Sequence, residues 1–230
     1  MKIAYAGLDL PEGKVKYDDP TVKRLVEKFE PKKVSPYFFA FIGDDFEKAD
    51  AIALSADSVL DLLILDMEKI ENRIARTSDE KENAFWKKCI EFMEEEKPLC
   101  DIEINEEEKA LLTELAPLSF KPTVVIDDFD GDVNALIRKV MEKAGVMFFY
   151  TAGKPEVHAW FVDVGDDIVT CAGKIHTDLA RGFIKAEIIN VDDYEQAHNL
   201  NDARSKGLTR LVDRDYIIRE GDIIDIRFNV

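Results

Sequence analysis

Runs of apolar residues and stretches of alternating apolar and polar residues predict strands near both ends of the chain. Short apolar runs typical of buried strands occupy residues 2–6, 36–42, 51–54 and 121–126. From 183 to 191 apolar and polar residues alternate, which predicts a strand that is buried on one face. The alternation returns over 223–228, after a turn that contains Gly221.

Between these strands, apolar residues recur at intervals of three and four, which predicts helices. One helix begins after Asp19, a good N-cap that precedes Pro20, and ends at Pro31. A short helix is expected over 105–115 behind an asparagine cap, and another over 133–144.

Residues 57–118 predict a helical hairpin. The apolar stripe of residues 57–76 has the spacing of a coiled-coil seam and consists of Leu60, Leu63, Met67, Ile70 and Ile74. A capping box at 77–80 begins a second helix with similar spacing, so the two helices are expected to pack antiparallel. Two interpretations remain open. The seam is a packing surface between the two helices, or the tip of the hairpin also binds a partner.

The chain is strongly acidic, with 48 Asp and Glu against 31 Lys and Arg among 230 residues and a net charge of −17. Nucleic-acid binding depends largely on neutralising phosphates, and an acidic surface opposes it at long range. We therefore expect no DNA binding, and RNA contact only where basic residues gather locally. Residues 151–230 are less acidic, with 15 acidic and 10 basic residues.

Cysteine and histidine content gives no sign of a metal, a cofactor or a disulfide framework. Cys89, Cys100 and Cys171 are widely spaced, and the three histidines have no spacing typical of a zinc site or a catalytic triad. We expect a cytoplasmic protein without membrane contact. The cysteines are expected to be reduced thiols, and the sequence shows neither a signal peptide nor an apolar run of about 18 residues.

The C-terminal third resembles a known family. The blocks that carry the resemblance are residues 148–160, Gly173-Lys-Ile-His-Thr-Asp178, Gly182-Phe-Ile-Lys-Ala-Glu187 and residues 221–230. They are similar to the C-terminal TGS domain of the YchF-type proteins, which are Obg-related P-loop NTPases of the cytoplasm. The resemblance implies a small β-grasp, ubiquitin-like domain that serves as a platform for RNA or protein and performs no chemistry itself.

A member of that family would carry its phosphate-binding loop after the first strand, where this chain has Gly7, Gly13 and Lys14. A P-loop requires Gly, four residues, Gly, Lys and a hydroxyl residue. Here five residues separate the glycines, Val15 follows the lysine, and Pro11 removes a backbone donor. Two interpretations remain open, a vestigial loop and an atypical nucleotide site.

The other nucleotide-binding segments of such a protein are also missing. Residues 20–36 resemble the segment after the first switch, but the switch itself and its metal-binding threonine are absent. Residues 43–50 stand where the second switch would carry Asp-x-x-Gly. That pattern occurs at 128–131, where we interpret it as an ordinary turn, and residues 127–130 lack an Asn-Lys motif for reading the base.

Six residues of the TGS-like region are candidates for contact with a partner or RNA. His176 and Thr177 either cap a short helix or touch a partner. Lys174, Arg181, Lys185 and Arg210 form a small positive patch in one interpretation and scattered surface charges in the other.

The sequence thus predicts an α/β protein in three parts. Residues 1–56 and 119–147 form a reduced Ras-like sheet, 57–118 a coiled-coil hairpin, and 148–230 a TGS domain. The expected function is that of a non-catalytic adaptor for the ribosome, RNA or a protein, with no catalytic residues. The alternative is an ATP- or GTP-binding NTPase or sensor that uses the atypical loop at residues 7–14.

Overall fold

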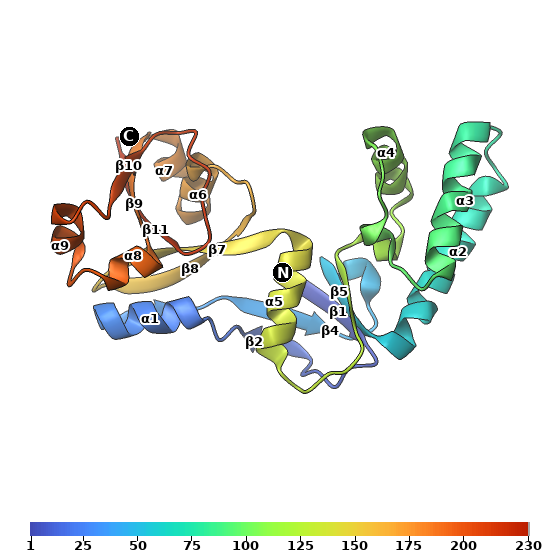
Figure 1. Ribbon diagram of the computed structural model, residues 1–230, viewed down its shortest axis with the longest axis horizontal. Helices are drawn as coiled ribbons and strands as arrows, with labels where there is room; N and C mark the ends of the chain where they lie inside the picture. The colour runs from blue at the N-terminus through green and yellow to red at the C-terminus, as the bar shows by residue number, and fades with distance from the viewer. Residues whose placement is uncertain (230) are drawn as a thin grey trace. The chain divides into compact units, whose positions relative to one another are not determined.

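The computed structural model describes residues 1–229 and has an α/β fold (Figure 1). Its contacts divide the chain into two compact units. The first unit contains residues 1–15 and 38–144, and the second contains residues 16–37 and 145–229. Among the described residues, no helix combines the length and the apolar character needed to cross a bilayer.

The first unit is built on a five-stranded sheet of order β2-β4-β1-β5-β6. Its strands are β1 (Lys2–Ala6), β2 (Gly13–Lys16), β4 (Phe38–Ile42), β5 (Ala51–Ser55) and β6 (Thr123–Ile126). The central strand β1 runs parallel to β4 and β5, and β5 runs parallel to β6. Helix α5 (Val133–Ala144) buries its apolar stripe and contacts β5 and β6, as its periodicity predicts.

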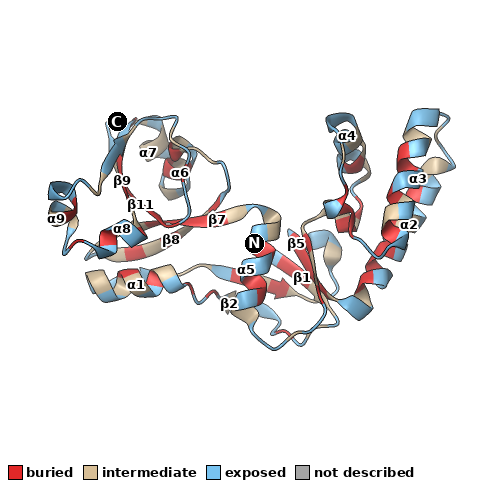
Figure 2. Ribbon diagram, in the orientation of Figure 1, coloured by how far each residue is buried: buried red, intermediate tan, exposed pale blue. Residues whose placement is uncertain are grey.

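A helical segment is inserted between β5 and β6. After the short helix η2 (Ala56–Ser58) it contains α2 (Val59–Ile74), α3 (Glu80–Glu94), η3 (Leu99–Asp101), α4 (Glu106–Leu115) and η4 (Leu118–Phe120). The predicted pairing of α2 with α3 is confirmed, and Figure 2 shows that both helices carry buried and exposed faces. Asn105 caps α4 in a capping box with Glu108.

Two details of the predicted hairpin are wrong. Leu60 is 44% exposed, whereas Leu62 and Asp66 are buried, so the buried face near the start of α2 is not the expected seam. The reason is that α2 packs against η4 as well as α3, which sequence spacing alone does not reveal. The cap of α3 is Asp79, which accepts hydrogen bonds from the backbone N–H groups of Lys81 and Glu82.

The second unit is built on a six-stranded sheet of order β10-β9-β11-β7-β8-β3. Its strands are β3 (Lys33–Ser35), β7 (Val146–Ala152), β8 (Glu156–Asp163), β9 (Phe183–Asn190), β10 (Arg210–Val212) and β11 (Asp222–Phe228). The pairs β7–β8, β9–β10 and β9–β11 are antiparallel, while β11–β7 and β3–β8 are parallel.

Five helices belong to the second unit. They are α1 (Pro20–Phe29), α6 (Ile168–Ile175), α7 (Thr177–Arg181), α8 (Val191–Glu195) and α9 (Leu200–Ser205). One face of the sheet packs its apolar side chains with those of α6 and α7 in a common core that includes Phe149, Cys171 and Ile188. The two alternating segments predicted at 183–191 and 223–228 are confirmed as β9 and β11.

Residues 16–37 belong to the second unit, although the sequence assigned them to the first part. Strand β3 pairs with β8, and the ring of Tyr37 stacks on Phe161 with centroids 4.8 Å apart. The ring of Tyr17 stacks on Phe148 at 5.8 Å. The segment thus buries aromatic surface on a sheet whose other strands begin at Val146, far along the chain.

The N-terminus of α1 is held by a buried carboxylate. Asp19 is 6% exposed and accepts a hydrogen bond from Thr21 N at 2.8 Å, as the predicted cap requires. Its other oxygen, Oδ2, accepts a hydrogen bond from the Tyr150 hydroxyl at 2.7 Å. Burial, and then the Asp19 charge, raise the pKa of Tyr150 far above its ordinary value, so this hydroxyl remains a donor.

Tyr150→Phe is expected to destabilise the second unit by about 2 kcal/mol, because a buried carboxylate loses a charge-assisted hydrogen bond. Urea unfolding followed by tryptophan fluorescence measures the loss, and Trp160 is the tryptophan of the second unit. The control is Tyr194→Phe, which removes a hydroxyl for which the described residues offer no hydrogen-bond partner. Equal losses in the two variants would contradict the role given to the Asp19 contact.

Candidate functional site

The loop after β1 is the first candidate, because a nucleotide would bind there in a P-loop protein. The chain leaves β1 through Gly7, which has a φ of 68°, and enters strand β2 at Gly13. The next helix along the chain is α1, which begins at Pro20 in the second unit. Phosphate binding of the P-loop type uses the N–H groups at the start of a helix that follows directly. This loop leads into a strand instead.

Side chains of the protein occupy the space around this loop. A Cβ atom at Gly7 would lie 2.0 Å from Ser55 Oγ and 2.3 Å from Ser58 Oγ. Leu10 is 8% exposed, and its carbonyl oxygen accepts a hydrogen bond from Tyr5 at 3.2 Å. Lys14 is exposed on β2. The glycine therefore allows close packing of the backbone against two hydroxyl groups.

Acidic residues in the segments that follow β4 and β6 have structural roles. At the position of the second switch, Asp50 Oδ2 accepts a hydrogen bond from Lys2 N at 2.7 Å, and Asp45 pairs with Lys48 at 2.6 Å. The turn interpretation of 128–131 is supported by Gly131, whose φ is 88°, and by the hydrogen bond from Asp132 N to Asp130 Oδ1. Within residues 1–229 no group of three or more His, Cys, Asp or Glu is placed to hold a metal ion.

His176 is a helix cap, as one of the two sequence interpretations expects. Its Nδ1 accepts a hydrogen bond from Asp178 N at 3.1 Å at the start of α7. The imidazole is 64% exposed, so the capping role leaves most of the ring accessible. Arg181, one turn further along, pairs with Asp178 at 2.9 Å, and Thr177 is the first residue of the helix.

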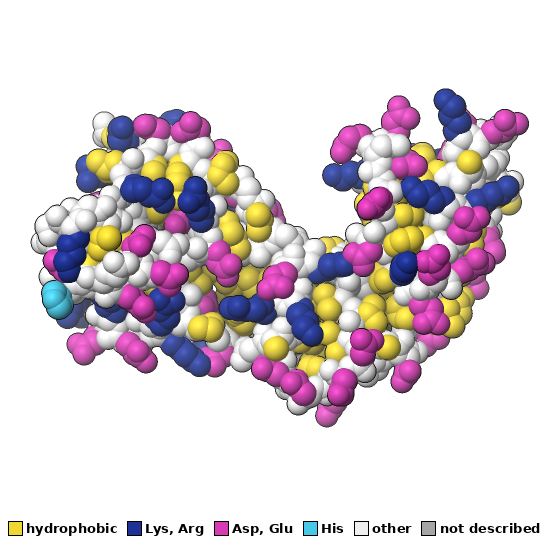
Figure 3. All heavy atoms as spheres, in the orientation of Figure 1, with side chains coloured by type: hydrophobic (Ala, Val, Ile, Leu, Met, Phe, Trp, Pro, Cys, Tyr) yellow, Lys and Arg dark blue, Asp and Glu magenta, His cyan; other side chains and the backbone are white. Residues whose placement is uncertain are grey.

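The four basic candidates do not gather into one patch. Lys174 is exposed near the end of α6. Arg210 is paired in register with Ile188, a residue of the core beneath α6 and α7, and therefore lies on that side of the sheet. Lys185 alternates with the core residue Ala186 and so faces the other side, where it pairs with Asp213 at 3.2 Å. On the face in Figure 3, carboxylates are interspersed with the basic side chains of both units.

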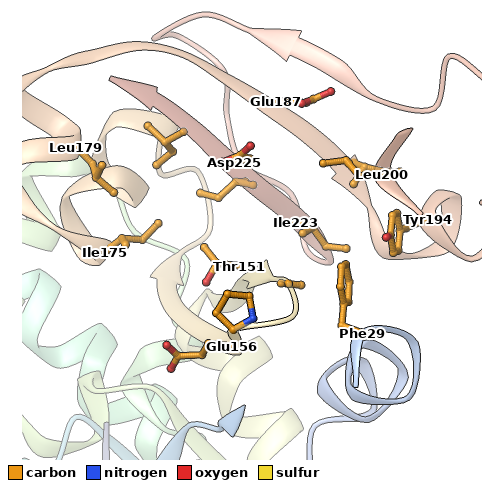
Figure 4. Close-up of a pocket in the computed structure, with 16 residues that line it drawn as sticks. Phe29, Thr151, Glu156, Ile175, Leu179, Glu187, Tyr194, Leu200, Ile223 and Asp225 are labelled. Carbon is orange, nitrogen blue, oxygen red and sulfur yellow. The ribbon is translucent and has the colours of Figure 1, made fainter. Parts of the chain in front are cut away.

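A pocket of about 450 Å³ in the second unit is the second candidate (Figure 4). Phe29 and Tyr194 form one of its walls, with ring centroids 5.2 Å apart and planes 2° from parallel. Other apolar lining residues are Ala152, Pro155, Ile175, Leu179, Ile189, Leu200, Ile223, Ile224 and Ile226. Such a mainly apolar hollow with a few polar groups is typical of ligand sites.

Three carboxylates lie at this pocket, and two of them are neutralised. Glu187 accepts hydrogen bonds from Arg204 Nε at 2.8 Å and Nη2 at 2.6 Å, which lowers the pKa of Glu187. Glu156 is bound by Lys33 Nζ at 2.8 Å and by the Ser35 hydroxyl at 2.5 Å, and its pKa is lowered as well. The third, Asp225, is exposed on β11.

Comparison with known proteins agrees with the fold and with the sequence blocks. The family model YchF-GTPase_C, described as a protein of unknown function, matches residues 146–229. The ribosome-binding ATPase YchF of Bacillus subtilis is 26% identical over 333 aligned positions, which cover 98% of this chain and 91% of the relative. Over residues 146–229 the chain matches the C-terminal region of the YchF family, and over most of its length it is similar to a YchF protein. The family's C-terminal region is thus the part in which the resemblance is most specific.

Two further relatives show how the similarity is distributed. The ribosome-binding ATPase YchF of Haemophilus ducreyi is 42% identical over 98 residues, which are 43% of this chain and 27% of the relative. The solved structure of the Schizosaccharomyces pombe YchF GTPase superposes with a TM-score of 0.77 at 18% identity. It covers 96% of this chain and 89% of that chain, and shows that the fold is shared.

The alignment with the Bacillus subtilis protein also shows how much shorter this chain is than the aligned length. It extends over 333 positions, whereas 98% of 230 residues is about 225, so about 108 positions of the alignment have no residue of this chain. The pocket was not predicted, because its lining comes from separate segments whose residues carry no common motif.

Proposed function

We propose that this chain is an adaptor that binds ribosomes through its second unit and does not hydrolyse nucleotide. The observation that carries the proposal is the passage of β1 through residues 7–12 into strand β2, without a helix N-terminus at which phosphates could bind. We infer the ribosome as partner from the names of the relatives, since several are called ribosome-binding ATPases. The loss of an ATPase site would leave the binding function.

We infer that the second unit contains a β-grasp domain of the TGS type. Strand order supports this inference, because the last strand, β11, lies between β7 and β9 and runs parallel to β7. The hairpin β7–β8, the helix α6 and the pair β9–β10 surround it in the order of a ubiquitin-like fold. Docking would use Lys174, His176, Thr177 and Arg181 on α6 and α7, with Arg210 at the edge of the same side. Lys185 faces the opposite side of the sheet and is outside this docking surface.

We propose the absence of nucleotide turnover because the chain lacks charged and polar groups placed to hold a triphosphate and its metal ion. Phosphoryl transfer depends on groups that hold the phosphates and the metal ion in place. Lys14 lies on β2 and is followed by Val15, so no hydroxyl residue stands where a P-loop supplies its magnesium ligand. The chain would therefore lack the means to hold a triphosphate and its metal ion for transfer.

Co-sedimentation of the full chain with purified ribosomes tests the docking surface. We expect the bound fraction to fall as salt rises, and Lys174→Glu to weaken binding about fivefold, which is the effect of losing one exposed ionic contact of about 1 kcal/mol. The matched control is Lys109→Glu on α4, an exposed lysine that should bind like the unmodified chain. Equal binding of both variants would contradict the assignment of α6 and α7.

The same preparation tests the nucleotide site. We expect neither hydrolysis of ATP or GTP above background nor a nucleotide-dependent rise in melting temperature, because a ligand that does not bind cannot stabilise the folded state. Turnover that Lys14→Ala abolishes would overturn the proposal in favour of the atypical NTPase.

A further inference from the structure

Strands β7 and β11 separate from each other beside the pocket of the second unit. The parallel ladder between them consists of one register pair, Ile223 with Tyr150. On its other side β11 stays paired with β9 as far as Phe228, and β7 stays paired with β8 as far as Ala152. The pocket is therefore a gap between two strands, lined on one side by residues 151–153 and on the other by residues 224–226.

One end of this gap is apolar and firmly built. The stacked rings of Phe29 and Tyr194 lie beside Ile223, as Figure 4 shows. Lys28, next to Phe29, donates hydrogen bonds to the carbonyl oxygens of Tyr194 and Ala197. These contacts fix the end of α1 against α8, so the apolar wall is formed before any ligand arrives.

The other end carries an exposed negative charge. Asp225 lies two residues after Ile223, on the same face of β11, because these two residues pair in register with Glu187 and Ile189 of β9. Within residues 1–229 the Asp225 carboxylate makes no hydrogen bond or ion pair with a basic side chain. The Asp225 charge acts on the Arg204 guanidinium, but Arg204 donates its two hydrogen bonds to Glu187.

We propose that this gap binds an extended peptide segment in which an apolar residue is followed, two positions later, by lysine or arginine. Residues i and i+2 of an extended chain lie about 6.6 Å apart and point the same way. An apolar side chain placed against Phe29, Tyr194 and Ile223 therefore brings the basic side chain to Asp225.

The probe for the test is a fluorescein-labelled heptapeptide, Gly-Thr-Leu-Thr-Lys-Thr-Gly, titrated with the full chain and followed by fluorescence anisotropy. We expect saturable binding with a Kd on the order of 0.1–1 mM, as suits a contact of a few side chains. Two comparison peptides carry Glu in place of Lys, or Ser in place of Leu. Each is expected to bind at least about fivefold more weakly, since an exposed ion pair and a small buried apolar side chain each contribute about 1 kcal/mol or more.

Variants of the protein locate the site. Asp225→Lys is expected to weaken binding of the lysine peptide about tenfold, because attraction is replaced by repulsion. The matched control is Asp215→Lys, the same charge change at an exposed residue outside the pocket. Circular dichroism verifies that both variants are folded.

Amide chemical-shift mapping on the unmodified chain gives a second readout that requires no variant. Shifts confined to residues 151–153 and 223–226 support the proposal. It is overturned by the absence of saturable binding, by equal binding of the Lys and Glu peptides, or by an Asp225→Lys variant that binds like Asp215→Lys. Ribosomes take no part in this experiment, so its outcome is independent of the function proposed above.

Discussion

Replacing Trp86 by alanine is expected to lower the free energy of unfolding of the first unit by about 4 kcal/mol, the usual cost of removing a fully buried aromatic side chain. Trp86 is 0% exposed and packs beside Phe85 with ring centroids 5.0 Å apart. Its Nε1 donates a hydrogen bond to Glu82 Oε1 at 2.9 Å. The substitution removes both the packing and the hydrogen bond in the hydrophobic cluster of the hairpin.

Trp86→Phe separates these two contributions. It keeps a ring in the cluster and should cost about 2 kcal/mol, from lost volume and a lost hydrogen bond to a charged group. The Trp86 N–H, and then Arg73, lower the pKa of Glu82. The stabilisation from this lowered pKa is present above the ordinary glutamate pKa of about 4.5 and disappears as pH falls through the lower folded-state value. The difference in stability between the unmodified chain and the Trp86→Phe variant should therefore shrink in acid.

Far-UV circular dichroism during urea unfolding measures the loss, because the hairpin supplies much of the helix of the first unit. Trp160 is the only other tryptophan of the chain, and it remains as a fluorescent reporter in the second unit. We expect its transition to change little in Trp86→Ala. A loss below about 1 kcal/mol in the first unit would show that the ring is not the centre of this cluster.

The second large effect is expected at Asp66, a buried carboxylate in the middle of α2. It is 1% exposed, and its two oxygens accept hydrogen bonds from Leu118 N at 2.6 Å and Ser119 N at 2.7 Å. Asp66→Ala leaves two backbone donors without partners in a buried place. We expect a loss of about 4 kcal/mol, because each unsatisfied buried group costs about 1–3 kcal/mol.

Two variants on the same helix define the mechanism. Asp66→Asn keeps one acceptor but turns an amide donor toward a backbone N–H, so it should lose about 3 kcal/mol. Glu68→Ala, an exposed carboxylate two positions further on, should change stability by less than about 0.5 kcal/mol. If Asp66→Ala destabilised the chain no more than Glu68→Ala, the connection between α2 and η4 would not be what anchors the hairpin.

Elements with strong local signals were predicted well. The cap at Asp19, the proline after it and the apolar stripe located α1, and the alternation of apolar residues located β9 and β11. The spacing of Gly7, Gly13 and Lys14 does not match a standard phosphate-binding loop. The structure shows in addition that this loop leads into strand β2. These signals are local, because caps, turns and periodicity depend on residues within a few positions of one another.

Pairing between distant segments was not predictable in the same way. The sequence pattern did not predict that β3 would pair with β8, or that Asp66, which is not one of the predicted seam residues, would accept hydrogen bonds from the backbone of Leu118 and Ser119. The sequence also did not predict the short helices α8 and α9 or the gap between β7 and β11. A strand's pattern shows that one face is buried, but several sheets can satisfy that pattern equally well.

The sequence by itself therefore determined the α/β character of the chain, the positions of most helices and strands, and the departure of residues 7–15 from the standard P-loop spacing. Tertiary structure alone decided that residues 16–37 belong to the second unit and that Asp225 borders a pocket beside Phe29. The physical reason is that local conformation follows from neighbouring residues, whereas burial and charge pairing depend on which distant surfaces meet.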